Sequence, residues 1–248
     1  MYSSIGNSRP LILGVTLVIL IASAGMLRLW EPRLGGFAVS RDASAEQLTA
    51  LSGNSGRLAL LGGMRSLVAS GFWLRANLAW EHRDLASTQA LIEATVAADE
   101  RPLYFWLNGA RILANDVPEW RMAGPVPAAL RPRVNEEQAQ VALRFLQKGL
   151  RWHGSDAALY IEMANIHLRR RGDVGSAARY YRLAAEQPHA PYYAARIHAE
   201  LLHEIGRGQE ALLWLRQILP GLPAADPLAR REVVLERIEA LERELATR

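Results

Sequence analysis

A helix–turn–helix pattern that repeats along the chain constrains its fold more than any other feature. The stretches GDVGSAARYYRLAAEQP (172–188) and GRGQEALLWLRQILPGLP (206–223) each contain a glycine turn, a small residue five positions later (Ala177, Ala211), a large residue and a closing proline. Another helix with periodic apolar residues precedes each turn. One such pair cannot bury its apolar face alone, so neighbouring pairs must stack around a common core. The pattern therefore predicts an all-α solenoid.

Two earlier stretches, residues 87–102 and 136–156, fit the same pattern in part: Ala94 is smaller than the usual large residue in the first, and no proline closes the second. The small residue then occurs at four positions, separated by 52, 35 and 34 residues: Ala90, Ala142, Ala177 and Ala211. From about residue 64 to residue 223 the pattern resembles the tetratricopeptide repeat (TPR), a helix pair of about 34 residues. The resemblance implies a right-handed α-solenoid of about four helix pairs whose concave face binds a protein partner. We expect this repeat domain to span residues 58–223.

A proline-rich stretch accounts for the one spacing that exceeds the repeat, by about 18 residues. It lies between helices expected over residues 103–115 and from about Asn135, and it contains four prolines: Pro118, Pro125, Pro127 and Pro132. Proline inside a helix costs about 3 kcal/mol, so residues 116–134 are predicted to form a loop inserted into one repeat. Trp120 and Arg121 are residue types that dominate interface hot spots, and they predict partner binding by this loop. The alternative is that Trp120 folds back and fills the adjacent groove.

The TPR resemblance also implies which residues line the concave face. In that family, the first-helix positions one and five after the aromatic position line the groove, and further residues follow one turn later. Applied to three helices, this rule gives the following partner-binding residues: Trp106, Ala110, Ile161, Asn165, Arg169, Arg196, Glu200 and His203. Apolar anchors and arginines on one surface suit an extended peptide or an amphipathic helix. Asn165 and Arg169 resemble part of the clamp that holds a peptide terminus in some family members, and the rest of that clamp is not evident.

The last segment, residues 224–248, is predicted to be a capping helix that begins at an Asp-Pro pair. It carries one apolar stripe between charged faces, formed by Val234, Ile238, Leu241 and Leu245. Terminal repeats need such a helix with a polar outer face. The alternative is a short coiled coil that would make the protein a homodimer.

An uncharged apolar run near the N-terminus, residues 11–27, predicts a membrane helix. About 17 residues is the short limit for crossing a bilayer, and Trp30 suits the membrane interface that follows. Residues 1–30 are therefore expected to anchor the chain, through apolar side chains that include Leu11, Ile12, Leu17, Val18, Ile19, Leu20 and Ile21. A cleaved signal peptide is the alternative, because residues 22–24 read Ala-Ser-Ala, the form of a cleavage site.

The region after the anchor reads as soluble. Residues 31–57 contain several glycines and serines and predict a tether. The apolar stretch 58–80 contains Arg65 and Arg75, which would be costly in hydrocarbon, so we expect a buried helix there. Long domains cross membranes irrespective of nearby charge. The expected location is the bacterial inner membrane, with the soluble domain in the periplasm.

Composition and motifs argue against most chemistry. The chain has no cysteine, which excludes disulfides, thiolate metal sites and cysteine nucleophiles. The net charge is only +4, with acidic residues interspersed among the basic ones, which argues against nucleic acid as a partner. HAELLHE (198–204) spaces its histidines five apart, whereas a helical zinc protease needs H-E-x-x-H. We therefore predict no catalytic residue, no metal site and no cofactor.

Together these features predict a non-enzymatic, membrane-anchored TPR scaffold that binds a protein partner in an envelope-associated complex. Its second contact is with membrane lipid, through the N-terminal helix. Two alternatives stay open: a periplasmic TPR chaperone that binds unfolded clients, and a metal-dependent hydrolase built on His198, Glu200 and His203.

Overall fold

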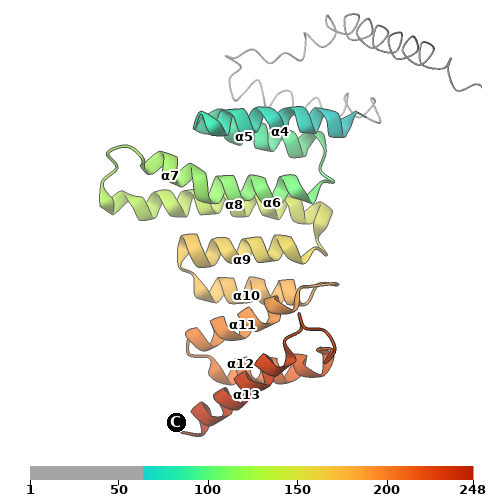
Figure 1. Cartoon of the computed structure of the whole chain (residues 1–248). Coiled ribbons are helices and arrows are strands. Elements are labelled where there is room, and N and C mark those ends of the chain that lie inside the picture. The colour runs from blue at the N-terminus through green and yellow to red at the C-terminus, as the bar shows by residue number, and fades with distance from the viewer. Residues whose placement is uncertain (1–63, 248) are drawn as a thin grey trace, which may run out of the picture. The chain divides into compact units, whose positions relative to one another are not determined.

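A computed structural model describes residues 64–247, and all regular structure within this range is helical. The all-α class predicted from the repeat is thereby confirmed for the described residues. Figure 1 labels the principal helices, which have these bounds: α4 (Arg65–Glu81), α5 (Leu85–Ala98), α6 (Leu103–Arg111), α7 (Val117–Met122), α8 (Arg131–His153), α9 (Ala157–Arg171), α10 (Val174–Ala185), α11 (Tyr192–Glu204), α12 (Gly208–Ile218) and α13 (Arg231–Ala246).

The helices pack mostly in the order in which they follow along the chain. The pairs are α4 with α5, α6 with α8, α9 with α10, and α11 with α12, and α13 packs on α12. Successive pairs meet through α5 and α6, through α8 and α9, and through α10 and α11. Packing against sequence neighbours is how repeat proteins build a continuous core, so the arrangement is consistent with a helical repeat.

The repeated small residues lie inside this core. In the last three units the small residue has no exposed surface, and the large residue four positions later is buried beside it: Ala142 and Leu146, Ala177 and Tyr181, Ala211 and Leu215. A methyl side chain lets the facing helix approach closely, while the large side chain fills the layer between helices. In the first unit, Ala90 is only half-buried.

Aspartates begin three of the helices. Asp84, Asp156 and Asp173 each accept a hydrogen bond from a backbone N–H in the first turn of α5, α9 and α10. Such a carboxylate satisfies an amide that has no partner within the helix. At the other end of α9, Gly172 adopts a φ of 63°, which ends the helix and lets the chain turn into α10.

The prediction of a loop over residues 116–134 is wrong. α6 continues through a π-helical turn (Ile112–Asp116) directly into α7. A short 3-10 turn (Ala128–Leu130) then leads into α8, which begins at Arg131. The irregular connection is confined to residues 123–127. The surplus residues therefore lengthen both helices of one pair, and Figure 1 shows the pair extending beyond its neighbours.

Two of the prolines fit these helices because they stand where no backbone donor is needed. The π turn closes with a bond from the Val117 N–H to the Ile112 carbonyl, and Pro118, which has no N–H, follows directly. Pro132 lies in the first turn of α8, where N–H groups have no helical acceptor. Proline content alone therefore predicted a longer loop than the structure contains.

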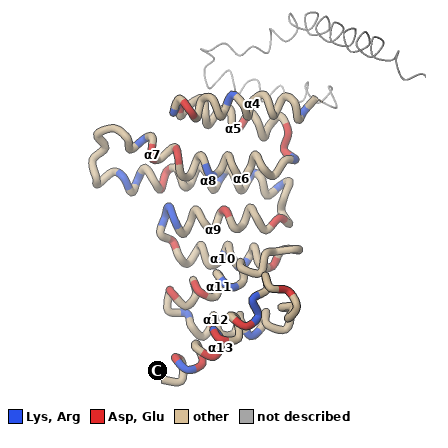
Figure 2. Tube along the Cα trace, viewed as in Figure 1, with Lys and Arg blue, Asp and Glu red and all other residues tan. Residues whose placement is uncertain are grey.

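The basic run 169–171 is used partly inside the chain. Arg170 donates to Asn135 Oδ1 over 2.8 Å and pairs with Glu119 at 3.3 Å. Arg171 donates to Glu136 over 2.8 Å. These contacts attach α7 and the start of α8 to the end of α9, where Figure 2 shows the run in blue.

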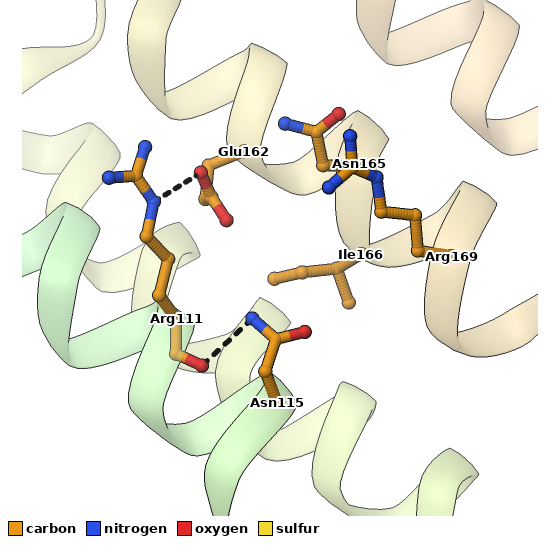
Figure 3. A pocket seen from close by; sticks show the side chains of 6 residues that line it. All are labelled: Arg111, Asn115, Glu162, Asn165, Ile166 and Arg169. Carbon is orange, nitrogen blue, oxygen red and sulfur yellow. Dashed lines mark hydrogen bonds and ion pairs between the residues drawn. The ribbon is translucent and has the colours of Figure 1, made fainter.

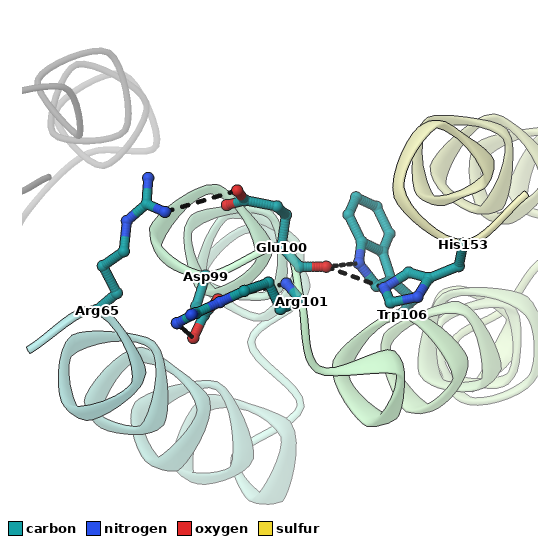
Figure 4. A network of polar contacts seen from close by, with 6 residues as sticks. All are labelled: Arg65, Asp99, Glu100, Arg101, Trp106 and His153. Atoms are coloured by element: carbon teal, nitrogen blue, oxygen red, sulfur yellow. Dashed lines mark hydrogen bonds and ion pairs between the residues drawn. The ribbon is translucent and has the colours of Figure 1, made fainter. Parts of the chain in front are cut away.

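A polar network holds the junction between α5, α6 and α8 (Figure 4). Asp99 is buried and accepts two hydrogen bonds from the guanidinium of Arg101, which lowers the pKa of Asp99. The Glu100 carbonyl oxygen accepts from Trp106 Nε1 at 2.9 Å and lies 3.0 Å from His153 Nε2. Buried backbone oxygens need such partners, so the turn before α6 is fixed in place.

The C-terminal stripe packs within the chain. Val234, Ile238 and Leu241 are buried and Leu245 is half-buried, all in the core formed with α11 and α12. The residues that a coiled-coil dimer would use as its seam are thus already covered. The helix begins at Arg231 instead of at the Asp-Pro pair, because Asp226 accepts from the Leu228 N–H in a preceding turn.

The predicted anchor (1–30), the tether (31–57) and residues 58–63 lie outside the described residues. Between residues 64 and 247, no helix combines the length and apolar character needed to cross a membrane. Helix α4, which contains most of the apolar stretch, is buried on one face only. Trp73 and three alanines face the core, whereas Leu67, Leu74 and Leu78 are exposed.

A candidate partner-binding groove

Three adjoining pockets follow the first helices of successive pairs, and Arg111 lines all of them. Their volumes are about 300 Å³ between α4 and α6, 260 Å³ between α6 and α9, and 470 Å³ between α6, α9 and the start of α11. We call this run of pockets the central groove. Two stripes of side chains face it, from α6 with its π turn and from α9: Tyr104, Asn108, Arg111 and Asn115, then Ile161, Glu162, Asn165 and Arg169.

The centre of the groove is an ion pair between two helix pairs. Arg111 Nε donates to Glu162 Oε2 over 2.9 Å, and Asn115 Nδ2 donates to the Arg111 carbonyl oxygen over 3.0 Å (Figure 3). Glu162 is buried, whereas Arg111 is exposed. The buried carboxylate therefore fixes the guanidinium at the groove surface.

Hydrogen-bond donors collect on the α9 side of the same pocket. Asn165 Oδ1 accepts from the hydroxyl of Tyr181 at 2.8 Å, which leaves the Asn165 Nδ2 group as a donor for a ligand. Arg169 lies beside it, exposed (Figure 3), and forms no ion pair with an acidic side chain of residues 64–247. Amide and guanidinium donors in one pocket suit a carboxylate.

The α4 end of the groove is aromatic. The rings of Trp73 and Tyr104 meet edge to face with centroids 5.6 Å apart. Trp80 Nε1 donates to Asp116 Oδ2 over 2.8 Å, so the π turn positions this ring at the groove edge. Tyr104 is 57% exposed. Together these rings offer apolar surface to a partner side chain.

The sequence assignment was wrong for α6. Trp106 and Ala110 are buried and do not line the groove. Trp106 packs against Phe145, with centroids 4.9 Å apart. The rule took Phe105 as the aromatic position of this helix, but the adjoining face packs in the core, where a Cβ at Gly109 would meet Ile92 of α5 and Phe145 of α8. The groove face of α6 is therefore rotated by about two residues from the predicted one.

Three of the predicted residues on α11 already have partners in the C-terminal segment. Arg196 Nη1 donates to the Ala229 carbonyl oxygen over 2.8 Å. Glu200 pairs with Arg237 at 2.7 Å, and His203 Nε2 lies 2.8 Å from Glu244 Oε2. The chain's own C-terminal segment thus occupies the surface that the family rule assigned to a partner at Glu200 and His203.

The other predicted residues lie on α9 and on α7. Ile161, Asn165 and Arg169 line the central groove, and their role in binding a partner stays a prediction. Trp120 and Arg121 lie on α7, half-buried, and Arg121 pairs with Glu137 at 3.0 Å. Sequence reasoning missed Tyr104, Asn108, Arg111, Asn115 and Glu162, although the first four recur at helical spacing along α6 and its π turn.

The histidines of HAELLHE point into different surroundings. His198 is buried, with Nδ1 2.7 Å from the Ala178 carbonyl oxygen and its ring edge-to-face with Trp214. His203 faces α13. Within the described residues no three histidine, aspartate or glutamate side chains are grouped as a metal ion would need.

Comparison with known proteins adds no relative. No protein-family model matches the chain, and no curated protein is significantly similar to it.

Proposed function

We propose that this protein is a non-enzymatic, TPR-type scaffold that holds a segment of a partner protein in the central groove. The observation that carries the proposal is the continuity of the groove across α4, α6 and α9, with Arg111 common to its three pockets. A surface that crosses several helix pairs suits an extended peptide or a helix. The buried alanines at repeat spacing support the TPR assignment.

The groove chemistry supports a partner segment with two features. A carboxylate would bind near Asn165 and Arg169, where donors are available. Apolar side chains would lie against Tyr104 and Trp80 at the aromatic end. An apolar anchor combined with a charged contact gives the partner segment both affinity and a defined orientation in the groove.

The proposed location rests on the sequence. The uncharged run 11–27 supports a single membrane helix, and we place the helical domain in the periplasm of a bacterial envelope. There it would hold its partner within a membrane-associated complex. Deletion of residues 1–30 is expected to move the protein from the membrane to the soluble fraction.

Site-specific photo-crosslinking in native membranes tests the proposal. A benzophenone amino acid at Tyr104 should capture one dominant protein. The same probe at Leu213, which is similarly exposed on α12 (55% against 57%), is the matched control. The double change Asn165→Ala and Arg169→Gln should reduce capture about tenfold. Capture of many unrelated proteins would instead favour a chaperone, and stoichiometric bound zinc would favour an enzyme.

A further inference from the structure

A second hollow of about 1060 Å³ adjoins the central groove, between the α10–α11 turn and the segment that joins α12 to α13. We call it the terminal pocket, and these residues define it: Tyr193, Arg196, Ile218, Leu222, Leu228 and Arg230. It shares His189, Pro191 and Tyr193 with the nearest pocket of the central groove. A chain lying in the groove can therefore continue into it.

The terminal pocket combines an apolar lining with uncompensated positive charge. Arg196 and Arg230 line it, and no aspartate or glutamate does. Burial and the neighbouring charge of Arg230 both lower the pKa of Arg196. Arg230 forms no ion pair with an acidic side chain in the described part of the chain. Two like charges close together are unfavourable, and an anion between them would remove that repulsion.

The backbone around the pocket is strained. Within the described residues three non-glycine residues have positive φ, and two of them line this pocket: His189 at 55° and Arg230 at 46°. This conformation brings the Cβ atom too close to the following carbonyl oxygen. Strain of this kind is often found where a side chain must be presented to a ligand.

The walls of the pocket indicate the kind of occupant. Leu228 is 76% exposed and Tyr193 is 43% exposed, so the pocket is open along one side. A small ligand is usually held in a cleft that covers most of its surface. The terminal pocket is instead open, apolar and cationic, and it is continuous with the central groove, so it suits a polypeptide.

We propose that the terminal pocket binds a segment of the partner protein in which a carboxylate is flanked by large apolar side chains. The carboxylate lies between Arg196 and Arg230, and the apolar side chains pack on Leu222, Leu228 and Tyr193. The proposal rests on the proposed function, because it names the chemistry of the partner beyond the central groove.

Fluorescence anisotropy of the full chain in amphipol tests the site with defined probes. The first probe is a short, capped, labelled peptide with the core Leu-Phe-Glu-Phe-Leu, and the second has Gln in place of Glu. We expect the Glu peptide to bind about tenfold more tightly, as for a charge-assisted hydrogen bond. Arg230→Gln should abolish the difference between the peptides. Arg144→Gln, on the exposed face of α8, should leave it intact.

One further variant keeps the test decisive. Leu228→Ser should weaken both peptides alike, and this exposed side chain can be changed without disturbing the core. Failure of the central groove is measured separately, by crosslinking at Tyr104. Equal binding of the two peptides, a difference that persists in Arg230→Gln, or binding of laurate in place of either peptide would overturn the proposal.

Discussion

Arg111 on α6 donates from Nε to Oε2 of Glu162 on α9, 51 positions later in the chain. The Glu162 side chain is 7% exposed and that of Arg111 is 52% exposed, so only the acidic end of the pair is buried. Because both residues also line the central groove, one ion pair links the packing of two helix pairs to the shape of the proposed binding surface.

Removal of the Arg111 side chain should therefore destabilise the packing of these helix pairs. Arg111→Met leaves a buried carboxylate without its partner, and we expect the free energy of unfolding to fall by about 1–3 kcal/mol. Urea denaturation of the full chain measures this change. Arg207→Met is the control, since Arg207 and Glu210 form a pair that is exposed at both ends and is screened by solvent, so its loss should have little effect on stability. Equal effects of the two changes would contradict the prediction.

One change, glycine to alanine, should have opposite effects in two helices. A Cβ at Gly109 would lie 2.7 Å from Ile92 Cγ2 and 3.1 Å from the ring of Phe145, so Gly109→Ala should destabilise the protein by about 1–3 kcal/mol. A Cβ at Gly71 in α4 meets no atom within 4 Å, so Gly71→Ala should stabilise by about 0.5–1 kcal/mol. Thermal unfolding of both variants checks the signs. Stabilisation by Gly109→Ala would mean that α5, α6 and α8 are packed more loosely than described.

The repeat was predictable because its determinants are local. Ala177 and Ala211 stand at fixed distances from their glycine turns, and each is buried as expected. The aspartate caps and the apolar stripe of α13 are also short-range patterns. These features depend on helix periodicity alone, which a sequence displays directly.

The groove was only partly predictable because its residues are decided by contacts between helices. Trp106 and Ala110 were counted from the aromatic position of the family, but both are buried and Trp106 packs on Phe145 of α8, so the predicted face of α6 was wrong. His203 has the spacing of a groove residue, yet Glu244 from α13 lies against it. The π turn before Pro118 likewise has no recognised sequence pattern that would have shown a helix continuing there.

Stability should fall as the pH decreases below neutrality. Burial lowers the pKa of His198 and of His167 below the ordinary value of 6.5. The unfolded chain then binds protons on passing through pH 6.5, while the folded chain binds them only at lower pH. The free energy of unfolding is therefore highest above about pH 7. It decreases as the pH falls from there towards the lowered pKa of these histidines in the folded state.

Urea denaturation at about pH 7.5 and 5.5 measures this dependence. His198→Gln should reduce the difference between the two pH values, and His82→Gln, at an exposed site after α4, is the control. Asp99, whose pKa is lowered by Arg101 from 3.8, loses its stabilising contribution only at still lower pH. A pH dependence that is unchanged in His198→Gln would show that this histidine is not buried as described.

Arg230→Gly should separate stability from binding. Arg230 has a φ of 46°, a conformation that costs a residue with a Cβ about 1–2 kcal/mol and glycine much less. We expect the variant to unfold at a higher temperature while losing the preference for the Glu peptide. Arg144→Gly, inside α8, should instead lose about 1 kcal/mol. Destabilisation of both variants alike would show that the backbone at Arg230 is not strained.

The extension formed by α7 and the start of α8 should be part of the fold, contrary to the loop prediction. Val117 has no exposed surface, Pro118 is buried, and Arg170 joins Glu119 and Asn135 to α9. Replacing residues 117–133 by a short Gly-Ser turn removes Val117, Pro118 and Glu119, and with them every one of these contacts except that between Arg170 and Asn135. The variant should lose about 2–4 kcal/mol and unfold several degrees earlier.

The matched control replaces only residues 123–127, the irregular connection, by a Gly-Ser segment of equal length, and should change stability by less than about 1 kcal/mol. Unchanged stability on removal of residues 117–133 would restore the loop interpretation.

Trp120→Ala then tests the interface role by itself. Trp120 is only half-buried, so the fold should tolerate its loss, and weaker capture of the crosslinked partner would place Trp120 in the binding surface. If Trp120→Ala captures the partner as well as the unchanged protein does, α7 has a structural role alone, which is to attach the pair of α6 and α8 to α9.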